Sequence, residues 1–585
     1  MRRVRVIEIL RPALLKGVRR EGHTQLRECS DAIAITMRRS KPHQQRGSVM
    51  TKAGKGYQSI AFLTVAFSIA PSLVFAQSLN GQGNIYARAR SDSLEEAGIL
   101  RTGTMLPVDS SARTPPGPYP SLAGSYTSSA QHPRVFMTPT DMSGLVTRIN
   151  SSGSFSAQSF AKLTNKVKAD LAANVDWDSV YSGCDLDIYL HAFSYEPVTG
   201  YADEIRTTNQ LGSAMHVREA MAPPTGAAIL ASRLSLYAAL VESGAKPPAA
   251  GPSSGEAAAV AKRILLAWAN RGFRDEKGNV LSRAEQFCDG QQHFNAVVQN
   301  GVGLQVGRGI IYSVHAQDLL QSIGAFNSAQ TNQLNVFHAA IFNLIRESSN
   351  FRAALPQMNG PATICERYSN HVGAHLLGLL AIARLLDDGR KFNAVLYGND
   401  RSIPVAIPWT NWFNHAVYGE NDKPIACHKN TGPDSLASHP SFQTAVVAPG
   451  EIEDRYRNAN AGQSFGYTLG VLAGLFNMAA LMKNAGYDAF EYRGTHRQSI
   501  EMATQYYACY GKNAGFKKTV TADDARACPD YQQYIGQIVN GLEPDIVMGA
   551  YRFPGNSVIT ELEPAARAAA GAEVLDAIRF GRWRD

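Results

Sequence analysis

The chain of 585 residues has few segments in which apolar and polar residues alternate, the pattern of a half-buried β-strand. It also lacks the heptad repeats of a coiled coil and any Cys-x-x-Cys pair. The first absence predicts a mostly α-helical protein. The last argues against zinc held by cysteine.

What the sequence has instead is a series of long segments with apolar residues at helical spacing. They span residues 156–174, 225–243, 255–271, 294–322, 330–348, 371–387, 467–485 and 496–510. Loops rich in Gly, Pro and Asn join them, which suggests antiparallel helix pairs arranged in a ring. Periodicity alone equally allows a solenoid. The hydrophobic content of 44% is enough for a substantial core.

The positive net charge of +8 is concentrated at the start of the chain. Residues 1–49 hold ten Arg and two Lys against four acidic residues, and two further lysines follow before residue 77, so the remainder is near −2. A net charge near −2 over this remainder does not imply a basic surface for nucleic acid. We therefore expect no nucleic-acid partner.

Residues 50–76 have the three parts of a secretory signal peptide: two lysines, the apolar run 60–70, and small residues ending at Ala76. Residues 1–49 are then an upstream extension that we expect to be disordered. The alternative, an Arg-rich tail before a membrane anchor, is disfavoured because the apolar run is shorter than the ~20 residues that span a bilayer. We expect a secreted or periplasmic protein without a membrane partner.

The chain has seven cysteines, of which Cys29 lies in the extension. The other six favour disulfides in an exported protein, although a reduced set of buried cysteines remains the alternative. The sequence does not choose the pairing, but Cys509 and Cys528 are close enough to close one loop.

Residues 77–131 are rich in Ser, Gly, Pro and Thr, which predicts an extended lead-in, and the folded domain is expected over 132–585. Two long segments, 175–224 and 388–466, lack helical periodicity. Loops of this kind over a helical scaffold are where a polymer-binding groove forms, and the second one holds Trp412 and His415.

A polar cluster stands directly before the apolar helix expected at 371–387. His371 and His375 are four residues apart and share one helix face, while Ser369 or Asn370 would cap the helix. Gly373 and Gly378 would allow a neighbouring helix to approach closely. By itself this pattern fits an anion site at a helix start or, equally simply, a cap followed by a packed histidine.

With Glu366 before it, the Asn370-His371 pair resembles the Asn-His motif of the alginate lyase type of polysaccharide lyase. A second motif agrees in order, with Arg455 and Arg457 followed by Tyr467 at the start of another apolar helix. The resemblance covers roughly residues 132 to 550 and is nearest to glucuronan and alginate lyases. Without it, the second motif fits a surface ion-pair cluster around Glu451 and Glu453 beside a packed tyrosine.

The resemblance implies an all-α (α/α) toroid of six or seven helical hairpins, an incomplete barrel whose long loops form a cleft. It implies β-elimination on a 1,4-linked polyuronate without a cofactor. The catalytic residues implied are Tyr467, His371, Asn370, Arg457 and Arg455. Substrate contacts are expected from Gln305, Arg308, Tyr312, His375, Arg367, Tyr368, His415 and Trp412. We expect a monomer.

Two features leave alternatives open. Gln305, Arg308, Tyr312 and His315 share one helix face, which predicts either a cleft-lining stripe or a solvated face. The His-x-x-x-His spacing occurs in zinc helices, but Val372 stands where a metalloprotease has Glu. A non-catalytic protein that binds acidic polysaccharide and a metal-dependent glycan hydrolase are therefore the competing functions.

Overall fold

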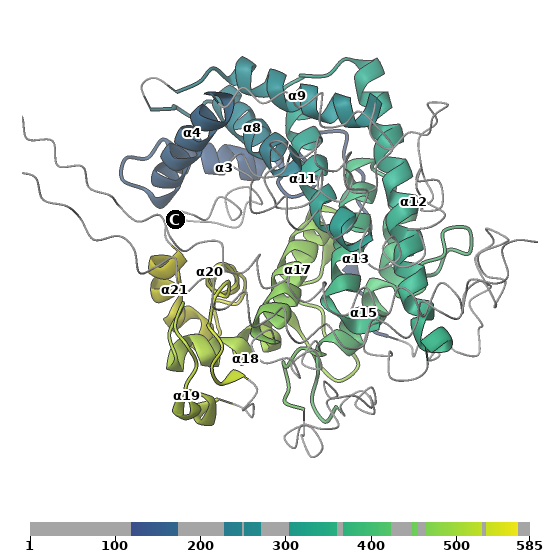
Figure 1. The fold of residues 1–585 in the computed structure, drawn as a ribbon, viewed down its shortest axis with the longest axis vertical. Helices are drawn as coiled ribbons and strands as arrows, with labels where there is room; N and C mark the ends of the chain where they lie inside the picture. The colour runs from purple at the N-terminus through teal and green to yellow at the C-terminus, as the bar shows by residue number, and fades with distance from the viewer. Residues whose placement is uncertain are drawn as a thin grey trace, which may run out of the picture. The chain divides into compact units, whose positions relative to one another are not determined.

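The computed structural model describes residues 119–172, 227–248, 251–270, 303–359, 367–422, 447–453, 464–528 and 534–570, all within a unit that spans Phe67–Asp585. These residues are mostly helical (Figure 1). The described strands form one short antiparallel sheet, in which β1 (Ala123–Gly124) pairs with β2 (Tyr487–Asp488). The prediction of a mostly α-helical protein is confirmed.

Six helices lie where apolar periodicity predicts them, with ends shifted by a few residues: α4 (Phe155–Ala172), α8 (Ala227–Glu242), α9 (Ser254–Asn270), α13 (Asn370–Leu385), α17 (Ser464–Asn484) and α18 (Ile500–Asn513). α11 (Gly303–Ser322) covers the described part of the segment predicted at 294–322. α12 (Ser328–Asn359) runs past its predicted end at residue 348. Helices that the sequence analysis missed are α3 (Pro139–Ile149), α14 (Gly389–Tyr397), α15 (Trp409–Ala416), α19 (Ala522–Ala527), α20 (Glu543–Arg552) and α21 (Ser557–Ala570).

The predicted irregular segment 388–466 was wrong in its first part, which holds α14 and α15. Asp388 caps α14 by accepting the amide of Lys391 at 2.9 Å, and Gly398 ends it with a φ of 64°. α15 begins directly after Pro408. Each helix makes only about two turns, too few for apolar periodicity to stand out in a sequence window.

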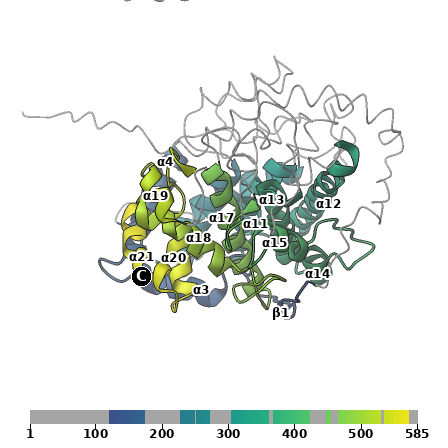
Figure 2. The ribbon, with the colours of Figure 1, turned by 90° about the horizontal axis from the view of Figure 1, so that it is seen from below.

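The helices α11, α13 and α17 are neighbours (Figures 1 and 2). Contacts between them show that they run in the same direction. At the carboxyl ends of α13 and α17, Nη2 of Arg384 donates to the carbonyl of Asn484 at 2.7 Å. α11 meets the first half of α13 near its own start, because a Cβ on Gly307 would lie 2.8 Å from the carbonyl oxygen of Ala374. The amino-terminal ends of α13 and α17 therefore lie on the same side.

Behind this row, α12 packs antiparallel to α11. Ser313 Oγ lies 3.1 Å from Nε2 of His338, and Gln317 Nε2 donates to Asn335 Oδ1 at 2.8 Å, so residue numbers rise along one helix as they fall along the other. α9 contacts both helices. Of the described helices, α17 alone is long and apolar enough to cross a membrane, but 72% of its apolar stretch is buried inside the protein, as in a core helix.

Part of the predicted lead-in joins the helical body. Residues 123–124 pair with β2, and the hydroxyl of Tyr126 donates to Asp387 Oδ1 at 2.8 Å, just beyond the end of α13. Further along, Asp318 near the end of α11 accepts the amides of Arg134 and Val135 at 2.8 and 2.9 Å. This segment ties together the carboxyl ends of α11 and α13. The extension, the signal peptide and residues 77–118 lie outside the described residues.

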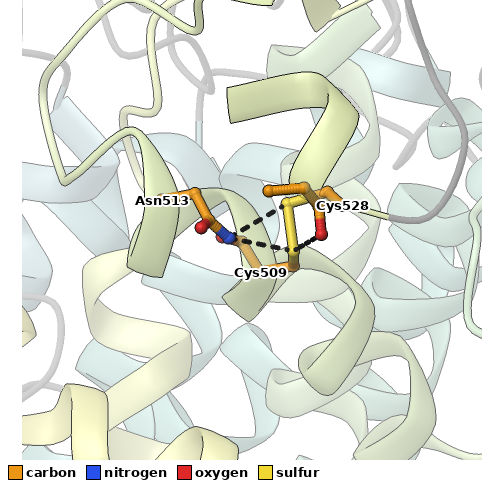
Figure 3. The surroundings of a disulfide bond; sticks show 4 residues. Cys509, Asn513 and Cys528 are labelled. Carbon is orange, nitrogen blue, oxygen red and sulfur yellow. Dashed lines mark hydrogen bonds between the residues drawn. A yellow bond between two sulfur atoms is a disulfide. The ribbon is translucent and has the colours of Figure 1, made fainter. Parts of the chain in front are cut away.

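The predicted loop closure between Cys509 and Cys528 is present as a disulfide that joins α18 to the residue after α19 (Figure 3). Asn513 lies beside it, and its Nδ2 donates to the carbonyl of Cys509 at 2.9 Å. The other cysteines beyond residue 76, Cys184, Cys288, Cys365 and Cys427, lie outside the described residues.

Candidate functional site

The first turn of α13 is held in place by α15. Ser369 is the N-cap residue, and its carbonyl accepts the indole N–H of Trp412 at 3.3 Å. The Trp412 ring fills the space above Gly373, where an added Cβ would lie 2.7 Å from the indole. Gly373 thus makes room for a side chain, whereas Gly378 allows the predicted close helix approach, its Cβ position lying 3.0 Å from the carbonyl oxygen of Gly307. Trp412 has no exposed surface, so it packs against α13.

The two histidines of α13 lie in different environments. His371 is partly exposed, and Asn370 before it is 5% exposed. His375 is fully buried, with Nε2 3.4 Å from Oγ of Ser348 on α12. His371 is the one that has access to solvent, and His375 belongs to the packing between α12 and α13.

Beside the start of α13, His415 on the last turn of α15 is enclosed by aromatic rings. Its ring centroid is 4.5 Å from that of Tyr368, which is 4% exposed. Its Nε2 lies 3.1 Å from the hydroxyl of Tyr119. Burial, with a smaller contribution from His496, lowers the pKa of His415 to about 4. His415 is therefore a neutral imidazole near pH 7.

Tyr467 lies in the first turn of α17 and is 5% exposed. Two residues earlier, the amide of Phe465 donates to Oε1 of Gln537 at 2.7 Å. The ring of Phe465 makes edge contacts with Tyr507, Tyr510 and Tyr534, at centroid distances of 5.9, 5.5 and 5.0 Å. The aromatic cluster and the hydrogen bond from the Phe465 amide fix the start of α17. They therefore also fix the position of Tyr467.

Glu451 and Glu453, just before the second motif, are fully buried. Oε2 of Glu451 accepts a hydrogen bond from the amide of Ala448 at 3.2 Å. The pKa of Tyr506 is raised mainly by burial and, to a smaller extent, by the Glu451 carboxylate. The surface ion-pair cluster offered as an alternative for these glutamates is therefore wrong. Arg455 and Arg457 lie outside the described residues.

The structure describes two of the four side chains in the predicted stripe on α11. Tyr312 is 3% exposed and His315 is fully buried, its Nδ1 lying 2.9 Å from Oγ of Ser232 on α8. The solvated-face alternative is therefore wrong for these two residues. The side chains of Gln305 and Arg308 are outside the described set. Arg367 donates from Nε to the carbonyl of Ala353 at 2.7 Å, and partial burial lowers its pKa.

The structure thus gathers Arg367, Tyr368, Asn370, His371 and His415 around the start of α13. The structure adds Tyr119 to this group, because its hydroxyl contacts His415. Sequence reasoning missed Tyr119, since its Ser/Gly/Pro-rich surroundings predicted an extended lead-in. Within the described ranges, no group of three or more His, Cys, Asp or Glu side chains has the geometry of a metal site.

No protein-family model matches the chain, and comparisons with curated proteins and with solved structures also find no match.

Proposed function

We propose that the chain is a polysaccharide lyase that cleaves a 1,4-linked polyuronate, a β-1,4-glucuronan or alginate, by β-elimination. The observation that supports it most is the parallel direction of α13 and α17, whose carboxyl ends meet at Arg384 and Asn484. Two motifs far apart in the sequence, Asn370-His371 and Tyr467, each open one of these helices. Both therefore belong to the same end of the helix row.

In the proposed reaction, side chains at the start of α13 hold the uronate carboxylate. The proton on the adjacent C5 is hard to remove while that carboxylate keeps its full charge. Hydrogen bonds from Asn370, His371 and an arginine would stabilise the dianionic intermediate that forms. Partial exposure of His371 and the positive end of the α13 dipole favour this role.

Tyr467 is the proposed base and acid. It takes the C5 proton as a phenolate and returns one to the departing O4, which leaves an unsaturated uronyl end. A nearby cation stabilises a phenolate, and Arg455 or Arg457 is proposed to supply it. Substrate contacts are proposed for His415 and Arg367, which lie near the start of α13.

The proposed architecture is an (α/α) toroid of six or seven hairpins. It is supported by the order of helix contacts, in which α8 packs on α11, α11 on α13, α13 on α17, and α17 on α20. α20 then packs on α21, where the guanidinium of Arg567 lies 5.9 Å from the ring centroid of Phe155 at the start of α4. Because α4 contacts α8, this order of contacts returns to its beginning.

The same proposal includes export of a monomer that uses no cofactor and has an acidic polysaccharide as its partner. The disulfide between Cys509 and Cys528 is compatible with an oxidising compartment.

A substrate panel tests the function. The purified protein is incubated with polyglucuronate, polymannuronate and polyguluronate, and the ultraviolet absorbance of the 4,5-unsaturated product is followed. Rising absorbance with one of them supports the lyase. Retention on an immobilised polyuronate with no absorbance change on any would favour a non-catalytic binding protein, and loss of activity with a chelator would favour the metal-dependent hydrolase.

A further inference from the structure

The segment around Tyr119 reaches the candidate site from far away in the sequence. Its hydroxyl contacts His415 across 296 residues, and its ring meets the imidazole edge-on at a centroid distance of 6.1 Å. A few residues later, Tyr126 is bound to Asp387 beyond the other end of α13. The segment is therefore held at two points, one at each end of that helix.

The direction of the hydrogen bond between Tyr119 and His415 depends on which imidazole nitrogen carries the proton. A neutral imidazole has one nitrogen that donates and one that accepts, and the hydrogen bond at one nitrogen decides which is which. Among the described residues, the phenol oxygen of Tyr119 has a hydrogen bond only to Nε2 of His415. Partial burial raises the pKa of Tyr119, which keeps its proton in place. Donation from this O–H to Nε2 would leave the His415 proton on Nδ1.

We propose that Tyr119 is a positioning residue of the lyase site: it holds the His415 proton on Nδ1, so that an uncharged N–H donor is available to an oxygen of the bound uronate. The substrate half of this inference rests on the proposed function, whereas the tautomer does not. Among the described residues, the groups that face the imidazole are Tyr119, Tyr368 and His496, and the last is itself 3.1 Å from the carboxylate of Asp422.

The direct test is the tautomer. Nitrogen-15 NMR of histidine-labelled protein at pH 7 distinguishes Nδ1–H from Nε2–H, and a His415→Gln variant assigns the signal. We expect Nδ1–H in the wild type and a mixture of the two forms in Tyr119→Phe, which keeps the ring and loses the hydroxyl. Tyr126→Phe is the matched control, since it makes the same change in the same segment, away from His415.

Activity is the second readout. A lost hydrogen-bond contact to the substrate should raise the KM of Tyr119→Phe about 3- to 10-fold, with kcat nearly unchanged and with Tyr126→Phe close to wild type.

A wild-type Nε2–H tautomer, or an unchanged Nδ1–H signal in Tyr119→Phe, would overturn the role of Tyr119 even in an active lyase. An unchanged KM in that variant would overturn the contact with substrate. Absence of cleavage by the wild type would instead overturn the lyase proposal and the substrate assigned here, whatever the NMR shows.

Discussion

At the scale of single residues, the environment rather than the residue type decides what each imidazole does. His338 is fully buried between α11 and α12, and both ring nitrogens have partners, the carbonyl of Leu334 at 3.0 Å and the hydroxyl of Ser313 at 3.1 Å. His415 is also neutral near pH 7, because burial lowers its pKa. His371 is partly exposed at a helix start. Of these three, His371 is the one that lies partly exposed at a helix start, where the helix dipole favours an anion.

Replacing Tyr467 with Phe should lower kcat by about 10²- to 10⁴-fold, because the phenol is the group proposed to move both protons. The ring and most of its packing are retained, so the expected loss is in kcat. Steady-state kinetics on the preferred polyuronate give the answer, with the exposed Tyr551→Phe as a control. Near-normal turnover in Tyr467→Phe would assign the chemistry to another residue.

His338 should make the folded protein less stable as the pH falls. Burial lowers the pKa of this imidazole to about 3 in the folded chain, from an ordinary value of 6.5. Between these values the unfolded chain binds a proton that the folded chain does not, so the free energy of unfolding decreases as pH falls, by about 1.4 kcal/mol per pH unit for this residue.

Urea unfolding at pH 7.5 and 5.5 measures this decrease. His338→Gln should be less stable than wild type at pH 7.5 because it disturbs a buried hydrogen-bonded site, yet it should lose about 1 kcal/mol less between the two pH values. Equal losses in the two proteins would show that His338 does not titrate in this way.

At the scale of elements, the crossing of α11 and α13 depends on two glycines. Gly307 and Gly378 let the helix backbones approach so closely that an added Cβ on either would lie 2.8 or 3.0 Å from a carbonyl oxygen of the other helix. That contact aligns α13 with its neighbours and so contributes to where Asn370 and His371 lie. The approach was predictable for Gly378, but the facing glycine on α11 was not.

Gly307→Ala should therefore destabilise the protein by about 1–3 kcal/mol, since the cost of overpacking exceeds the gain of ~1 kcal/mol in helix propensity. Gly470→Ala is the matched control, because Gly470 is exposed within α17 and nothing lies within 4 Å of the added Cβ. It should be neutral or stabilising by up to ~1 kcal/mol. Chemical denaturation of both variants measures the change in the free energy of unfolding. Similar changes in the two variants would mean that the helix crossing tolerates an extra methyl group.

At the scale of the whole molecule, distant segments meet at both ends of α13. Tyr119 and His415 meet near its start, and Tyr126 and Asp387 meet beyond its end. Residues 119–135, most of them predicted as lead-in, thus belong to the folded body. A protein prepared without them would lose contacts at both ends of this helix.

Export makes a prediction about the mature chain. Cleavage after Ala76 should place Gln77 at the amino terminus, since residues 74–76 provide the small-residue site that follows the apolar run. Amino-terminal sequencing of protein recovered outside the cytoplasm checks this. Recovery of a chain that retains residues 50–76 would contradict the secretory interpretation.

Helical periodicity is a local property, and it was enough to predict a mostly α-helical protein and the positions of most long helices. The short chain separation of Cys509 and Cys528 indicated one loop that a disulfide could close. The sequence also located Asn370-His371 and Tyr467 at helix starts. The three-dimensional fold was needed to show that α13 and α17 are parallel neighbours, that Trp412 and His375 are buried, and that Tyr119 contacts His415. Periodicity shows which helix face is apolar, but it does not show which distant segment covers that face.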